Sequence, residues 1–145
     1  MKFLNCTSKT EINHPIAVAE KLLTPESVMY NELKEKNDWK YNSGSSENVI
    51  RLLFYIQFRP VEIFLFRPKN PWTKMIGFSN GKDIFINIYR LDNLNVTDLI
   101  GLMLHEYAHH VGFNHGSGWF ANYKTQDKCQ YSVPYYLSSN VEKWL

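Results

Sequence analysis

Four of the five histidines of the chain lie within one short stretch, from His105 to His115. The stretch reads His-Glu-Tyr-Ala-His-His-Val-Gly-Phe-Asn-His. In a helix, residues four apart are separated by about 40° of rotation and ~6 Å of rise, so His105 and His109 share a face. Two imidazoles presented in this way can bind one Zn²⁺ ion. The stretch therefore predicts a helix that carries metal ligands, and the rest of the fold has to support that helix.

Gly112 allows the chain to turn where this helix ends, because glycine adopts left-handed backbone angles at little cost. The turn can bring His115 back beneath the helix as a third ligand. Glu106 can take a proton from water on the metal and act as the general base. Three protein ligands with an open fourth position are typical of a catalytic zinc site. We therefore predict one zinc per chain on His105, His109 and His115, with Glu106 as a catalytic residue.

The pattern H-E-x-x-H-x-x-G-x-x-H resembles that of the metzincin clan of zinc metallopeptidases, and residues 112–115 are similar to the astacin version. The resemblance implies a zinc metallopeptidase with the same three ligands and the same base, and we expect an endopeptidase rather than an exopeptidase. One feature departs from the family. Metzincins carry a methionine in a tight turn beneath the zinc, whereas every methionine here precedes His115: Met1, Met29, Met75 and Met103.

The stretch from Ser132 to Tyr136 resembles the Ser-x-Met-x-Tyr turn of astacins and serralysins, with Pro134 in place of the methionine. Proline can fix a turn through its locked φ angle. The resemblance implies that Tyr136 lies near the zinc and assists catalysis. The alternative is that Tyr135 and Tyr136 are plain packing residues.

The length of 145 residues predicts a single domain, residues 1–145, with a true hydrophobic core. The net charge of +2 is slight, and the basic residues are scattered, so no nucleic-acid partner is predicted. No apolar run approaches the ~20 residues of a membrane span. We expect a monomer that acts on a peptide or protein substrate. Residues 1–6 lack the apolar stretch of a secretory signal. The protein either stays inside the cell or is exported with a signal that has been removed.

Helices are predicted for much of the chain. The helix with the histidines should begin at Asn95, because Asp98 three residues later forms a near capping box. It is apolar around most of its circumference and should be central and buried. Thr24 followed by Pro25 and Glu26 predicts a helix start. The other helices are expected at residues 16–23, 24 to about 36, 47–58 and 137–145, and residues 1–12 are expected to be irregular.

Strands are predicted between these helices. Residues 61–66 are β-branched and aromatic, and residues 75–79 and 82–89 flank Asn80-Gly81, a strong hairpin signal. We therefore predict an α+β fold of compact zincin type, with a small twisted sheet, a hairpin, a central active-site helix and flanking helices. The metzincin resemblance implies that substrate lies extended beside an edge strand near residues 82–89 and adds itself to the sheet through main-chain bonds. Residues 116–132 read as a long loop, in which Trp119 and Phe120 either wall a substrate pocket or seal the core.

Two other functions remain open. Small bacterial rRNA-maturation metalloproteins resemble this chain in H-x-x-x-H-x-x-G-x-x-H, but their motif lacks the glutamate, so Glu106 and the slight net charge argue against an RNA substrate. A non-catalytic zinc-binding module would need a fourth protein ligand, for which Cys6, Cys129 and His14 are the candidates. Cys6 and Cys129 could also pair in an exported protein or stay free thiols. His110 is rotated about 100° from His109 and is expected at the surface or beside the ligands, not as a ligand itself.

Overall fold

The computed structural model describes residues 1–116 and 124–145. In this part of the chain one sheet has four strands, β1 (Phe3–Asn5), β2 (Val61–Phe66), β3 (Gly77–Ser79) and β4 (Ile84–Asn87), in the order β1-β2-β4-β3. Strands β1, β2 and β4 run parallel, and β3 pairs antiparallel with β4 at one edge. The α+β class is confirmed. The expectation of irregular structure before residue 13 is wrong in part, because β1 pairs with β2 and a 3₁₀ turn, η1 (Thr10–Ile12), follows it.

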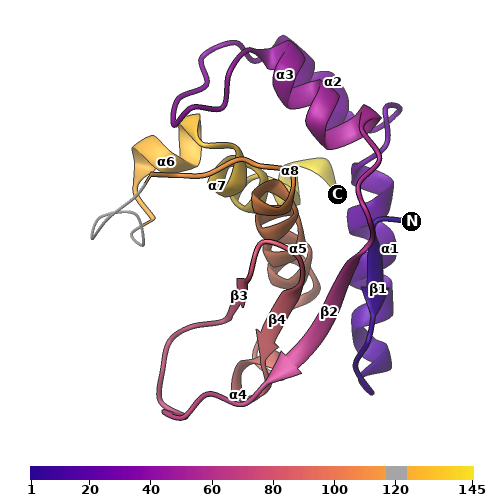
Figure 1. The fold of residues 1–145 in the computed structure, drawn as a ribbon, viewed down its shortest axis with the longest axis vertical. Helices are drawn as coiled ribbons and strands as arrows, with labels where there is room; N and C mark the ends of the chain where they lie inside the picture. Colours follow the sequence, from indigo (N-terminus) through magenta and orange to yellow (C-terminus); the bar gives the residue numbers. More distant parts are fainter. Residues whose placement is uncertain (117–123) are drawn as a thin grey trace.

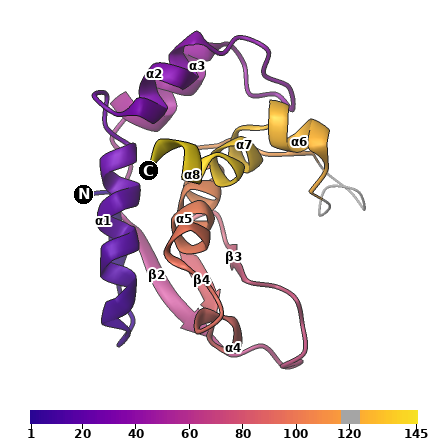
Figure 2. The same cartoon turned by 180° about the vertical axis from the view of Figure 1, so that it is seen from behind.

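The two faces of the sheet differ in their environment. One face presents side chains that are at most 2% exposed: Phe3, Val61, Ile63, Ile84 and Ile86. Helices α1 (Asn13–Leu22) and α5 (Val96–His110) lie on the same side of the sheet (Figures 1 and 2). Alternation along the strands turns a row of phenylalanines to the other face: Phe64, Phe66, Phe78 and Phe85.

Helix α5 is central, as predicted, and begins at the predicted cap. The Asn95 side chain accepts from the Asp98 amide at 2.8 Å, and the Asp98 carboxylate accepts from the Asn95 amide at 3.2 Å. This capping box satisfies two amides that have no partner inside the helix. Most apolar side chains of α5 are buried: Leu99, Ile100, Met103, Leu104, Tyr107 and Ala108.

The hairpin is confirmed, with shorter strands than predicted. The Asn80 side chain accepts from the amides of Lys82 and Asp83, and Gly81 has the positive φ that the turn requires. The expectation of an edge strand at 82–89 is wrong. Strand β4 lies inside the sheet between β2 and β3, so β3 forms the edge on this side and β1 forms the opposite edge.

The remaining helical segments are short, and several predicted boundaries move. The second helix starts at Val28 rather than Thr24, because the Ser27 side chain caps it by accepting from the Tyr30 amide at 3.0 Å. The predicted helix at 47–58 is divided into an α-helical and a π-helical turn. The segments are α2 (Val28–Glu35), α3 (Ser46–Ile50), η2 (Arg51–Tyr55), α4 (Ile88–Leu91), α6 (Gln126–Tyr131), α7 (Val133–Ser139) and α8 (Val141–Trp144).

Two expectations near the C-terminal end need correction. The loop predicted at 116–132 contains helix α6, which the Thr125 side chain caps by accepting from the Lys128 amide. The stretch from Ser132 to Tyr136 is not a tight turn, because Pro134 lies in the first turn of helix α7, where its missing amide costs nothing. In the described ranges, no helix has both the length and the apolar character needed to cross a membrane.

Candidate metal centre

Three imidazoles meet at the end of helix α5. The Nε2 atom of His109 lies 3.2 Å from Nε2 of His105 and 3.2 Å from Nε2 of His115. Within residues 1–116 and 124–145, these three histidines are the group of candidate ligands whose donor atoms gather closely enough to hold one metal ion. The three residues predicted as ligands are therefore brought together.

The chain reverses after α5 in a way that returns His115 to the helix. Gly112 has φ +109°, a backbone conformation that residues with a side chain rarely adopt. Its amide donates to the His109 carbonyl at 3.0 Å. The Phe113 amide donates to the Ala108 carbonyl at 2.9 Å, and the Phe113 side chain is only 4% exposed. The buried ring anchors the reversed segment, and His115 follows two residues later.

Backbone carbonyls hold two of the rings in a fixed orientation. His109 donates from Nδ1 to the Phe113 carbonyl at 2.8 Å, and the ring of His105 hydrogen bonds to the carbonyl of Pro134 in α7. A neutral imidazole that donates from Nδ1 carries a bare lone pair on Nε2. Lone pairs that face each other at 3.2 Å repel, so this arrangement is favourable when a cation lies between them.

The distances are compatible with a tetrahedral metal ion such as zinc. At Zn–N distances of about 2.0–2.1 Å and tetrahedral angles, two ligand nitrogens lie about 3.3–3.4 Å apart. The observed separations of 3.2 Å are close to this spacing. A carbonyl that accepts from the second ring nitrogen is also the usual companion of a metal-bound histidine.

The rings are kept in the neutral form that binds metal. Burial, with help from the nearby His109 and His115, lowers the pKa of His105 to about 3. Burial also lowers the pKa of His109. Both imidazoles are therefore neutral at neutral pH, and a metal ion can bind them without first displacing a proton.

Glu106 lies at the wall of a cleft beside His105. The cleft has a volume of about 600 Å³ and is lined by Lys74, Met75, Ile76, Gly77, Thr97, Asp98, Gly101, Leu102, His105, Glu106, Lys124, Tyr135 and Ser138. Glu106 is only 7% exposed, and burial raises its pKa to about 7. A carboxyl group that gains and loses a proton near neutral pH is suited to proton transfer.

The tyrosine beside the histidines is Tyr135. Its ring centroid lies 4.7 Å from that of His105 and 4.5 Å from that of His115. The hydroxyl of Tyr136 instead donates to Glu32 of α2, and its ring packs edge-on against Trp39. The expected position of Tyr136 near the zinc is therefore not supported. Consecutive residues of a helix point about 100° apart, and α7 directs only Tyr135 to the histidines.

The other candidate residues lie apart from the cluster. His110 is half-buried rather than fully at the surface: its Nδ1 lies 3.3 Å from the Gly81 carbonyl of the hairpin, and its ring packs against Phe58. Cys6 is exposed, Cys129 is half-buried, and both thiols are free. Neither cysteine nor His14 belongs to the group around His105 among the residues that the structure describes. Trp119 and Phe120 lie outside the described residues.

Sequence reasoning missed three contributions to this site: the Tyr135 ring and the carbonyls of Phe113 and Pro134. Metal-ligand spacing predicts side chains, and it carries no signal for a carbonyl that orients them. Comparison with protein-family models, with curated proteins and with solved structures gives no match to this chain.

Proposed function

We propose that this protein is a zinc-dependent peptidase in which His105, His109 and His115 hold the metal. The observation that carries the proposal is that Nε2 of His109 lies 3.2 Å from Nε2 of both His105 and His115, with carbonyls fixing two of the rings. Imidazole ligands suit zinc, copper, iron and nickel. Zinc is favoured because three protein ligands with an open fourth position are typical of its catalytic sites.

Glu106 supplies the proton transfer in this proposal. A zinc ion in the site would polarise a carbonyl oxygen as a Lewis acid and lower the pKa of water to about 7. The Glu106 carboxylate can take the proton of the attacking water and later deliver it to the leaving amine nitrogen. Its pKa of about 7 supports both roles, because an acid–base catalyst works best when its pKa is near the operating pH.

The edge strand supports a peptide as the substrate. Strand β3 pairs with β4 on one side, and Gly77 at its start lines the cleft together with Met75 and Ile76. An extended peptide can add to such an edge through main-chain hydrogen bonds, which hold a substrate of almost any sequence. A Cβ at position 77 would lie 2.7 Å from the Phe85 carbonyl and 3.1 Å from Leu102, so a larger residue would push β3 away from β4.

Metal content and peptide cleavage, measured on the same samples, test the proposal. His105→Ala, His109→Ala and His115→Ala should each lose zinc in elemental analysis, whereas the matched control His110→Ala should retain it. Glu106→Gln should retain zinc and cleave a mixed peptide library ~10²–10⁴-fold more slowly than wild type, the range for loss of a general base.

The same samples separate the proposal from its rivals. Full zinc retention in His115→Ala would exclude the three-histidine site. Zinc binding without cleavage of any library peptide would favour a non-catalytic binding module. Metal-dependent degradation of RNA by a wild type that leaves peptides intact would assign the protein to RNA maturation.

A further inference from the structure

The connection between β2 and β3, residues 67–76, exposes large apolar side chains and is called the docking loop below. Trp72 is 84% exposed, Met75 48% and Ile76 42%, and Phe78 of the adjoining β3 is 38% exposed. Figure 1 shows this connection as the long pink excursion from the lower end of the sheet. Several large apolar groups exposed on one loop indicate an interaction surface, whereas a single one does not.

The docking loop is held from behind by two residues of β4 and α4. Arg90 donates to the Thr73 carbonyl at 2.7 and 3.0 Å and to the Trp72 carbonyl at 3.3 Å. The buried Asn87 donates from its side chain to the Met75 carbonyl and from its amide to the Ile76 carbonyl, both at 2.8 Å. Because the backbone is fixed on this side, the Trp72 side chain is presented to solvent at little further entropic cost.

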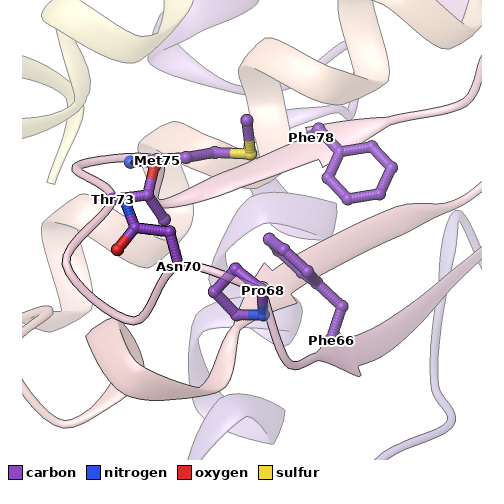
Figure 3. Close-up of a pocket in the computed structure, with 6 residues that line it drawn as sticks. All are labelled: Phe66, Pro68, Asn70, Thr73, Met75 and Phe78. Carbon is purple, nitrogen blue, oxygen red and sulfur yellow. Dashed lines mark hydrogen bonds between the residues drawn. The ribbon is translucent and has the colours of Figure 1, made fainter.

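An apolar cavity of about 470 Å³ lies between the docking loop and the edge of the sheet. Figure 3 shows Pro68, Met75 and the rings of Phe66 and Phe78 around it, with Asn70 and Thr73 at one end. The ring centroids of Phe66 and Phe78 are 5.0 Å apart. The exposed apolar groups therefore continue into a hollow lined mainly by carbon.

The docking loop itself carries charge of one sign. It has three basic residues and no acidic one: Arg67, Lys69 and Lys74. All three belong to exposed residues. The whole chain carries only +2, so the loop alone exceeds the net positive charge of the molecule. Its complement is an anionic partner.

We propose that the docking loop binds the protein to the surface of an anionic lipid bilayer. Tryptophan is favoured at the headgroup level of a bilayer, where its ring is buried and its N–H stays hydrated. Lysines beside it are attracted to anionic headgroups while their alkyl stems cover apolar surface. A fluid interface accepts a protruding Trp72 without a matching hollow, which a folded protein partner would have to provide. Three residues of the docking loop, Lys74, Met75 and Ile76, also line the cleft beside Glu106, so the loop would bring that cleft close to the bilayer.

Binding to lipid vesicles tests the proposal. The full chain should co-sediment with vesicles of equal parts phosphatidylcholine and phosphatidylglycerol, and hardly with phosphatidylcholine alone. Trp72→Ala should weaken binding about tenfold or more through lost apolar burial. Lys69→Glu with Lys74→Glu should weaken it about 30-fold or more. The matched control is Lys21→Glu with Lys34→Glu, which makes the same charge change on exposed residues of α1 and α2. This control should bind vesicles at least tenfold more tightly than the Lys69→Glu, Lys74→Glu variant.

Other outcomes would overturn it. Equal losses in the two double variants would show that net charge alone drives binding. Equal binding to both vesicle types would show that anionic headgroups are not required. Full binding by Trp72→Ala would show that the docking loop does not contact the bilayer. If wild type ignores anionic vesicles but an immobilised polyglutamate peptide retains it through Lys69 and Lys74, the partner is an acidic protein. The substituted side chains are exposed, so unchanged circular dichroism is the check on folding.

Discussion

At the scale of single residues, Tyr135 and Tyr136 have different partners although they are neighbours in the sequence. The Tyr135 ring packs against His105 and His115, whereas the Tyr136 hydroxyl donates to Glu32, which also accepts from Trp144 at 3.1 Å and pairs with Lys143 at 2.7 Å. Tyr136 and its neighbours therefore join α7 and α8 to α2, and Tyr135 supports the rings of the candidate ligands.

Substitutions at these two positions should separate metal binding from stability. Tyr135→Ala should lower zinc affinity by about tenfold or more, because groups that orient metal ligands typically contribute that much, and Tyr135→Phe should keep the affinity. Tyr136→Phe should leave zinc affinity unchanged and lower the free energy of unfolding by about 1–2 kcal/mol, through loss of a hydrogen bond to a carboxylate. Zinc titration measures the affinity, and urea unfolding measures the free energy of unfolding. Loss of zinc from Tyr136→Phe would show instead that Tyr136 contributes to the metal site.

At the scale of secondary structure elements, two glycines make a matched pair. Gly112 ends α5 with φ +109°, and Gly81 turns the hairpin with φ +85°. A Cβ would meet nothing within 4 Å at either position. Alanine should therefore cost each about 1–2 kcal/mol of stability, from backbone strain alone. Only Gly112→Ala should also weaken zinc binding, because Gly112 directs the return of His115. Equal zinc affinities in the two variants would contradict this role.

The accuracy of sequence-based prediction also differs between elements, for physical reasons. Helix α5 begins at its predicted residue because the Asn95 cap and the apolar pattern both specify it locally. The edge strand could not be placed, since strand order depends on contacts between residues distant in sequence. The grouping of the candidate ligands was predictable because helical spacing fixes His105 and His109, whereas the partner of the His105 ring comes from α7. The family resemblance does not predict the direction of Tyr136, because Pro134 starts a helix here rather than a tight turn.

At the scale of the whole molecule, metal binding should change global stability. Helix α5 packs against the sheet and α1 and carries the ligands, and α7 completes their surroundings through Pro134 and Tyr135. A ligand that binds only the folded state at ~100 times its Kd stabilises it by about 2.7 kcal/mol. Removal of zinc by a chelator should therefore lower Tm by roughly 5–10 °C for a chain of this size. Calorimetry measures this shift, and His110→Ala should behave as wild type.

The contiguity of the three histidines has a consequence for the order of folding. Since all three lie between residues 105 and 115, a zinc ion can be captured by one helical turn and its exit before the sheet exists. Capture at that stage would favour the nascent helix, which is marginal in isolation. The affinity for zinc would then increase in two stages. The second increase would occur when α7 packs against α5 and Pro134 orients the His105 ring. Because this early binding would be far weaker than binding to the folded protein, most of the stabilisation would remain, and refolding should be faster with zinc present throughout than in its absence.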